Sequence, residues 1–110
     1  MLLKKQLAGD LMYKLEYLPV AKRDIVDIAI YISHELSNPT ASEKMISKII
    51  KAIDKLKGSP YLSRVHYPIR PLKYEYRRLI VQNYLVFYYV NEEKKLITVA
   101  RVIYARRKGR

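Results

Sequence analysis

The stretch from Lys73 to Arg107 constrains the fold of this chain more than any other part of the sequence. It contains three runs rich in β-branched and aromatic residues, separated by short polar breaks at Gln82-Asn83 and Asn91–Lys95. Such side chains fit the pleated surface of a sheet, and polar breaks of this length are typical of hairpin turns. The stretch therefore predicts a three-stranded antiparallel meander.

The first half of the chain predicts one strand and two amphipathic helices. Alternation over Leu11 to Leu18 indicates a strand that stops at Pro19. Apolar residues then recur at helical spacing from about Val20 to Leu36, and again from Thr40 to about Leu56. The predicted buried positions are Ala21, Ile25, Ile28, Ala29, Ile32 and Leu36 in the first helix, and Met45, Ile49, Ala52, Ile53 and Leu56 in the second.

Local signals between these elements complete the predicted fold. Thr40-Ala-Ser-Glu43 has the pattern of a capping box at the start of the second helix. Tyr61–Pro71 has no clear period and is expected to be a loop. The order is thus β-α-α-β-β-β, an α+β domain with a helical hairpin packed on one face of a small antiparallel-rich sheet. We expect the first strand to join the meander beside a central strand.

Length and composition favour a single domain. Residues 12–110 would form it, and residues 1–11 would be an N-terminal extension, either disordered or a short extra helix. There is no cysteine, which excludes disulfides and thiolate metal sites. No apolar run approaches the roughly 20 residues that cross a bilayer, and the first residues lack the continuous apolar core of a signal peptide. We expect a cytoplasmic protein without membrane contact.

The charge of the chain is strongly positive and unevenly distributed. The formal net charge is +12. Residues 1–59 contain 10 Lys and Arg against 7 Asp and Glu, whereas residues 60–110 contain 12 against 3, together with eight of the eleven tyrosines. Charge concentrated in the predicted sheet indicates a nucleic acid, the ribosome or an acidic protein as partner. Solubility alone is the simpler alternative.

Arginines and tyrosines are the side chains best suited to chemistry here. The sequence offers no glycine-rich phosphate loop, no helical histidine pair and no converging acids, so we expect no metal and no cofactor. RNA can be cleaved without metal when its own 2′-hydroxyl attacks the phosphate, if the protein stabilises the added charge and moves protons. Arginine supplies the charge, and tyrosine can stack on bases or transfer a proton. Surface charge and sheet packing are the structural alternatives for the same residues.

Three segments resemble the RelE/ParE superfamily of bacterial toxin–antitoxin modules, which includes plasmid stabilisation toxins. They are Tyr13–Ile25, Tyr76–Tyr88 and Val99–Arg107. The resemblance implies the same β-α-α-β-β-β order over about Met12 to Lys108. It also implies a toxin that a separate acidic antitoxin holds inactive in a heteromeric complex.

The resemblance leaves the mechanism open between two activities. RelE-like members cut messenger RNA on the ribosome as mRNA interferases, and ParE-like members poison DNA gyrase. Carried onto this sequence, the basic residues of RelE-like toxins fall on Arg77 or Arg78 and on Arg106 or Arg107. An arginine of RelE falls instead on Leu85, and a frequent histidine is replaced by Tyr104.

Our main expectation is a metal-independent endoribonuclease acting on ribosome-bound mRNA. The alternatives are a ParE-like toxin that inhibits DNA gyrase without cutting RNA, and a non-toxic basic nucleic-acid-binding adaptor. For the nuclease, the predicted catalytic residues are Arg77, Arg78, Tyr104 and Arg107; the predicted RNA- or target-binding residues are Tyr76, Tyr84, Arg101, Arg106 and Lys108. Aliphatic residues such as Ile80, Ile97 and Ile103 are expected on the uncovered sheet face, where they would attract the antitoxin.

Overall fold

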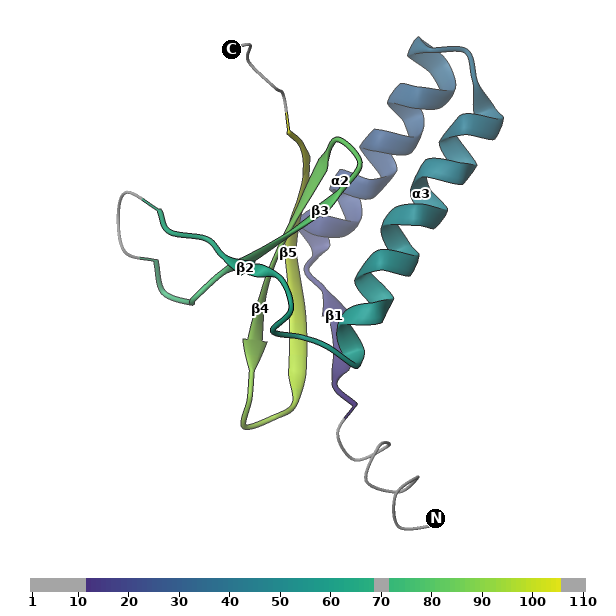
Figure 1. Ribbon diagram of the computed structural model, residues 1–110. Coiled ribbons are helices and arrows are strands. Elements are labelled where there is room, and N and C mark those ends of the chain that lie inside the picture. The colour runs from purple at the N-terminus through teal and green to yellow at the C-terminus, as the bar shows by residue number, and fades with distance from the viewer. Residues whose placement is uncertain (1–11, 69–71, 106–110) are drawn as a thin grey trace, which may run out of the picture.

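The structure is a computed structural model that describes residues 12–68 and 72–105. It centres on a five-stranded sheet in the order β1-β5-β4-β3-β2 (Figure 1). The strands are β1 (Lys14–Tyr17), β2 (Arg64–Val65), β3 (Arg77–Val81), β4 (Tyr84–Asn91) and β5 (Leu96–Tyr104). β3, β4 and β5 pair in antiparallel fashion, which confirms the predicted meander.

The first strand pairs with the last. β1 runs parallel to β5, from Lys14 opposite Leu96 to Tyr17 opposite Val99. β5 is therefore an interior strand, with β1 on one side and β4 on the other. β5 also extends beyond β1, because its residues after Val99 have no partner in β1. Periodicity along the chain contains no signal for this pairing.

Two helices cover one face of the sheet (Figure 1). The first, α2 (Pro19–Ile30), continues as the wider π-helical segment η1 (Tyr31–Glu35). The second, α3 (Pro39–Asp54), ends in the 3-10 turn η2 (Lys55–Lys57). The predicted helical hairpin on one face of an α+β sheet is confirmed.

The structure corrects the predicted start of the second helix. Asn38 caps α3, since its Oδ1 accepts a hydrogen bond from the backbone N of Ala41 at 3.0 Å. Pro39 occupies the first helical position, where its fixed φ suits the helix and its missing N–H leaves no intrahelical bond unmade. The N-cap therefore lies before the proline, and the capping box predicted at Thr40–Glu43 is wrong.

The loop predicted over Tyr61–Pro71 contains the short strand β2. Arg64 pairs with Arg78, and Val65 pairs with Arg77. Two residues are too few to show a period, so this strand could not be predicted from local sequence.

The core lies between the helices and the sheet. It contains most of the predicted helix positions, with Ile28, Ile49 and Ile53 among them, packed against Val86 and Tyr88 of the central strand. The remaining fully or nearly fully buried sheet residues of this layer include Ile97, Val99 and Val102.

Two of the predicted apolar positions are wrong. Leu36 is 57% exposed, because it follows η1 at the end of the helix and the chain turns at Ser37, whose φ is 50°. Ile97 is fully buried, because it pairs with Val90 on the face that the helices cover. By contrast, Ile80 is 68% exposed on the opposite face, as predicted.

Candidate functional site

The sheet face opposite the helices, which we call the open face, is the candidate site. On β4, Val86 and Tyr88 are fully buried toward the helices. Because successive strand residues point to opposite faces, Leu85, Phe87 and Tyr89 belong to the open face. Residues paired across strands share a face, so the strand register divides the open face into rows.

The first row is apolar. Ile80 of β3 pairs with Leu85 of β4, and Leu85 pairs with Ile103 of β5. Leu85 and Ile103 are half-buried, and Ile80 is mostly exposed. We call these three residues the apolar row.

The second row is basic and crosses four strands. Arg64 pairs with Arg78, Arg78 with Phe87, and Phe87 with Arg101. The ring of His66 lies edge-on to that of Phe87, with 5.1 Å between centroids. Arg64 and Arg78 form no ion pair with a carboxylate in the described part of the chain. We call them the arginine pair.

Arg101 differs from the arginine pair because its charge is already matched. Its Nε and Nη2 donate to the two carboxylate oxygens of Asp24 at 2.7 and 3.0 Å. Asp24 also accepts the backbone N–H of Val102 at 2.9 Å, on the part of β5 that extends beyond β1. Burial acts to raise the pKa of Asp24, but these hydrogen bonds outweigh it and lower the pKa. Arg101 therefore fastens α2 to β5.

Tyrosines form the next part of the open face. Tyr74 stacks on Tyr89 with 4.0 Å between centroids and 3° between planes, and Tyr76 lies edge-on to both rings. Beside them lies a cavity of about 440 Å³, whose lining includes Glu16 and Thr98. The Thr98 hydroxyl donates to Glu16 Oε2 at 3.0 Å, so this carboxylate is partly satisfied within the fold.

Arg77 points away from the open face. It pairs with the buried Tyr88, and its Nη1 donates to the carbonyl of Ser63 at 2.7 Å. Its guanidinium also lies over the ring of Tyr61, 4.9 Å from the centroid. The phenol of Tyr88 donates to the carbonyl of Pro60 at 2.7 Å. Arg77 and Tyr88 thus hold residues 60–63 against the sheet, immediately before Arg64.

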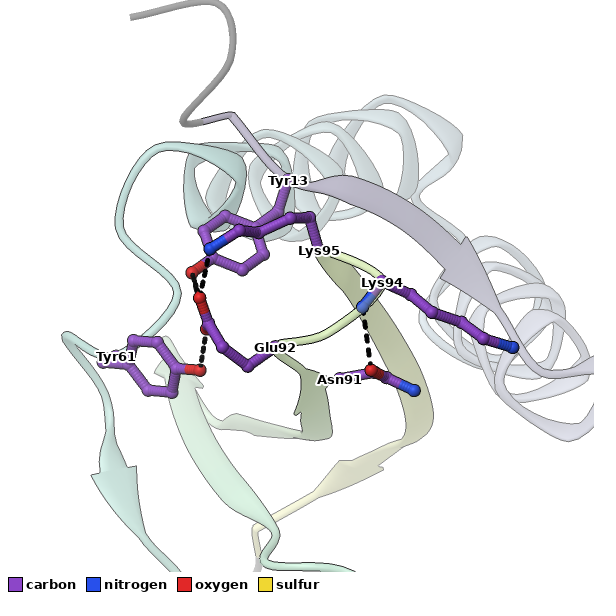
Figure 2. Close-up of polar contacts among 6 residues, drawn as sticks. All are labelled: Tyr13, Tyr61, Asn91, Glu92, Lys94 and Lys95. Carbon is purple, nitrogen blue, oxygen red and sulfur yellow. Dashed lines mark hydrogen bonds and ion pairs between the residues drawn. The ribbon is translucent and has the colours of Figure 1, made fainter. Parts of the chain in front are cut away.

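A second polar cluster surrounds Glu92 in the β4–β5 turn (Figure 2). The Tyr13 phenol donates to both carboxylate oxygens at 2.7 and 2.9 Å, and Tyr61 and Lys95 donate as well. Hydrogen bonds from Lys95, Tyr61 and Tyr13 lower the pKa of Glu92 to about 2. We call these four residues the Glu92 clasp, since they join the start of β1, the segment after η2 and the β4–β5 turn.

Comparison with known proteins identifies the family. The family model described as "ParE toxin of type II toxin-antitoxin system, parDE" matches residues 15–109. The chain belongs to the ParE toxin family. The toxin shares its fold with the solved structure of the chromosomal ParDE toxin–antitoxin system from P. aeruginosa, at 18% identity and a TM-score of 0.71. That match covers 86% of this chain and 98% of the other.

Two further solved structures share the fold of the toxin. The RelBE2 toxin–antitoxin complex from Mycobacterium tuberculosis matches at 15% identity and a TM-score of 0.62, over 87% of this chain and 95% of that one. The archaeal RelE–RelB complex from Pyrococcus horikoshii matches at 16% identity and a TM-score of 0.60, over 88% and 99%. No curated protein matches the sequence. The predicted RelE/ParE-like fold and superfamily are confirmed.

The predicted site residues of the toxin do not all converge. Arg78 and Arg101 belong to the basic row, and Arg77 lies on the other face. Tyr84 is only 8% exposed, and it packs edge-on against Tyr104 with 5.6 Å between centroids. Burial raises the pKa of Tyr84, which is opposite to the change that proton transfer at neutral pH requires. Tyr104 is 58% exposed at the end of β5.

Of the other predicted site residues, one lies on the open face and three lie outside the described residues. Tyr76 lies in the tyrosine cluster, and Arg106, Arg107 and Lys108 lie outside the described residues. Sequence reasoning missed Arg64, because nothing in the sequence places it opposite Arg78. His66 is also absent from the predicted site residues, yet its ring lies beside Phe87 on the open face.

The described residues contain neither a metal-binding cluster nor a membrane-spanning helix. No group of three or more His, Asp or Glu side chains there is arranged to hold a metal ion. No helix within residues 12–68 and 72–105 is both long and apolar enough to cross a membrane.

Proposed function

We propose that this toxin arrests growth by inhibiting DNA gyrase and does not cleave RNA. The observation that carries the proposal is the match of the ParE family model to nearly the whole chain. It replaces our first expectation of an mRNA interferase, because the family match favours the gyrase alternative. Membership of a toxin family also gives the non-toxic adaptor no support.

The geometry of the open face supports the same proposal. Leu85 stands where the resemblance to RelE-like toxins implies an arginine, and it is part of the apolar row. The guanidinium of Arg77 already donates a hydrogen bond to the backbone carbonyl of Ser63, and Tyr84 is buried. Arg77 and Tyr84 are therefore poorly placed to stabilise a cleaved phosphate, whereas the apolar row that includes Leu85 suits packing against a protein surface.

A supercoiling assay with purified gyrase tests the proposal. The toxin should block supercoiling of relaxed plasmid or leave it cleaved, and transcripts mapped by primer extension after induction should stay intact. An Arg23→Ala variant, altered on the outer side of α2, should act like the wild type. New cuts within codons, with gyrase activity unchanged, would refute the proposal.

Cleavage of ribosome-bound mRNA is the second candidate, and one observation favours it. Arg78 and the His66 ring lie beside Phe87 on the open face, and Arg64 pairs with Arg78. The arginines could bind phosphate there, and the imidazole could move a proton. If this candidate holds, His66→Ala should abolish cuts in a programmed ribosome reaction. Cleavage that persists in both His66→Ala and Arg78→Ala would rule out this site.

We further propose that an acidic antitoxin binds the toxin. The similar structures include complexes of toxin with antitoxin, and the net charge of +12 would be complemented by a negative partner. Co-expression with the neighbouring open reading frame should yield a stable heteromer. A toxin that purifies alone in full yield, and that the neighbour's product neither binds nor neutralises, would contradict this.

A further inference from the structure

We propose that the apolar row and the arginine pair together form one docking site for a peptide that carries aliphatic side chains beside carboxylates. The site deepens the antitoxin partnership proposed above and rests on it for the source of the peptide. The chemistry of the peptide, and the toxin residues that would bind it, follow from the arrangement of side chains on the open face.

The apolar half of the site is continuous across three strands. Single exposed aliphatic residues are common on protein surfaces and need no partner. Ile80, Leu85 and Ile103, however, are direct register neighbours, so their side chains adjoin one another. Ile80 keeps 68% of its surface exposed, although its strand neighbour Val81 is buried. A partner that covers this row would remove apolar surface from water.

The basic half of the site carries uncompensated charge. Like charges directly opposite each other on adjacent strands destabilise a sheet. Arg64 and Arg78 are such a pair, and no described carboxylate is paired with either. Arg101, in the same row, shows the alternative, because Asp24 neutralises it. An anionic partner would relieve the repulsion within the arginine pair.

The adjacency of the two halves favours a peptide over nucleic acid. Arg78 and Ile80 are two residues apart on β3, and so share a face at a separation of roughly 6.6 Å along the strand. A nucleic acid strand could use the arginines, but it has no aliphatic group to cover Ile80. An extended peptide with an aliphatic and an acidic residue at the same two-residue spacing satisfies both halves at once.

Fluorescence anisotropy with designed probes tests the site. The full chain, made by cell-free synthesis, would be titrated against three labelled probes of eight units: Leu-Ser-Glu-Ser repeated twice, the same peptide with serine for leucine, and a single-stranded RNA. The leucine-containing peptide should bind at least tenfold more tightly than either other probe. Ile80→Ser and Arg78→Ala should each weaken its binding about tenfold.

Matched variants on α2 provide the controls. Val26→Ser removes an aliphatic side chain that is 54% exposed, and Arg23→Ala removes an exposed arginine. Both should leave peptide binding unchanged. The proposal is overturned if the RNA binds more tightly than the leucine-containing peptide, if no peptide binding is measurable, or if Ile80→Ser binds like the wild type. Co-purification with the antitoxin tests the partnership separately, so the two can fail independently.

Discussion

At the scale of single residues, the buried carboxylate of Asp24 has two structural roles. It pairs with Arg101, and it accepts the backbone N–H of Val102 where β5 extends beyond β1. A buried N–H without an acceptor is costly, so the side chain replaces the hydrogen bond that a longer β1 would have provided.

Removing this carboxylate should destabilise the fold. We expect Asp24→Ala to lower the free energy of unfolding by about 2 kcal/mol, because the Val102 N–H loses its acceptor. Asp24→Asn retains an oxygen acceptor, so its free energy of unfolding should fall by less. Asp27→Ala, on the exposed side of the same helix, serves as the control. Urea unfolding of the three variants measures the difference, and equal losses in Asp24→Ala and Asp27→Ala would contradict the assigned role.

The Glu92 clasp should make stability depend on pH in the acid range. The pKa of Glu92 is about 2 in the folded chain, against an ordinary value of 4.5. A lowered pKa means that the clasp stabilises the fold above about pH 4.5, and that this contribution is lost as the pH falls toward 2. Glu92→Gln should therefore reduce the decline in the urea midpoint between pH 5 and pH 2.

The neighbouring Glu93 provides the matched control for this measurement. Glu93→Gln removes the same charge from the same turn, but Glu93 is exposed and is not part of the clasp. Its pH profile should follow that of the wild type. Identical pH profiles for the wild type and Glu92→Gln would show that the Glu92 clasp contributes nothing to the stability of the fold in solution.

The arginine dipeptide shows what residue-level reasoning can and cannot predict. Consecutive residues of a strand point to opposite faces, so Arg77 and Arg78 lie on different faces, although both were predicted to be catalytic residues of one site. The interaction partners of the two arginines could not be predicted in this way. Only the folded chain brings the carbonyl of Ser63 to Arg77 and places Arg64 beside Arg78.

At the scale of elements, the helical hairpin is held by both packing and a polar bond. The Ser42 hydroxyl of α3 donates to the carbonyl of Ala29 in α2 at 2.9 Å. Ser42 is buried, so this bond satisfies a hydroxyl that would otherwise lack a partner. The link lies close to the position where α2 gives way to the wider turn of η1.

The first turn of α3 offers a direct test of the corrected cap. Asn38→Ala should lower the free energy of unfolding by about 1 kcal/mol, because the N–H of Ala41 loses its acceptor. Thr40→Ala, which removes the hydroxyl of the mistaken capping box, should change it little. Chemical denaturation of both variants compares them, and a larger loss in Thr40→Ala would restore the capping box.

Elements with a long, regular pattern were predictable, and short ones were not. Helical spacing placed Ile28, Ile49 and Ile53 in the core, and the meander followed from its three β-rich runs. β2 has only two residues, and its place is set by pairing with β3. The position of β1 beside β5 likewise depends on tertiary packing, which local propensity does not encode.

At the scale of the whole molecule, the net charge of +12 should govern how fast the toxin meets its partner. Attraction between a basic toxin and an acidic antitoxin speeds association and is screened by salt. We expect the association rate constant to fall at least tenfold between 50 mM and 500 mM NaCl, with a smaller change in the dissociation rate. Stopped-flow mixing measures both, and a salt-independent association rate would show that charge does not steer the encounter.

The parallel pairing of β1 with β5 also determines when the sheet can close during synthesis of the chain. The two strands are about eighty positions apart in the chain, and β5 is the last of the described strands to be made. A nascent chain can form its helical hairpin early, but it cannot close the sheet until the residues of β5 have left the ribosome. The apolar row includes Ile103 of β5, so the docking site proposed above cannot form on the growing chain before β5 has been made and paired with β4.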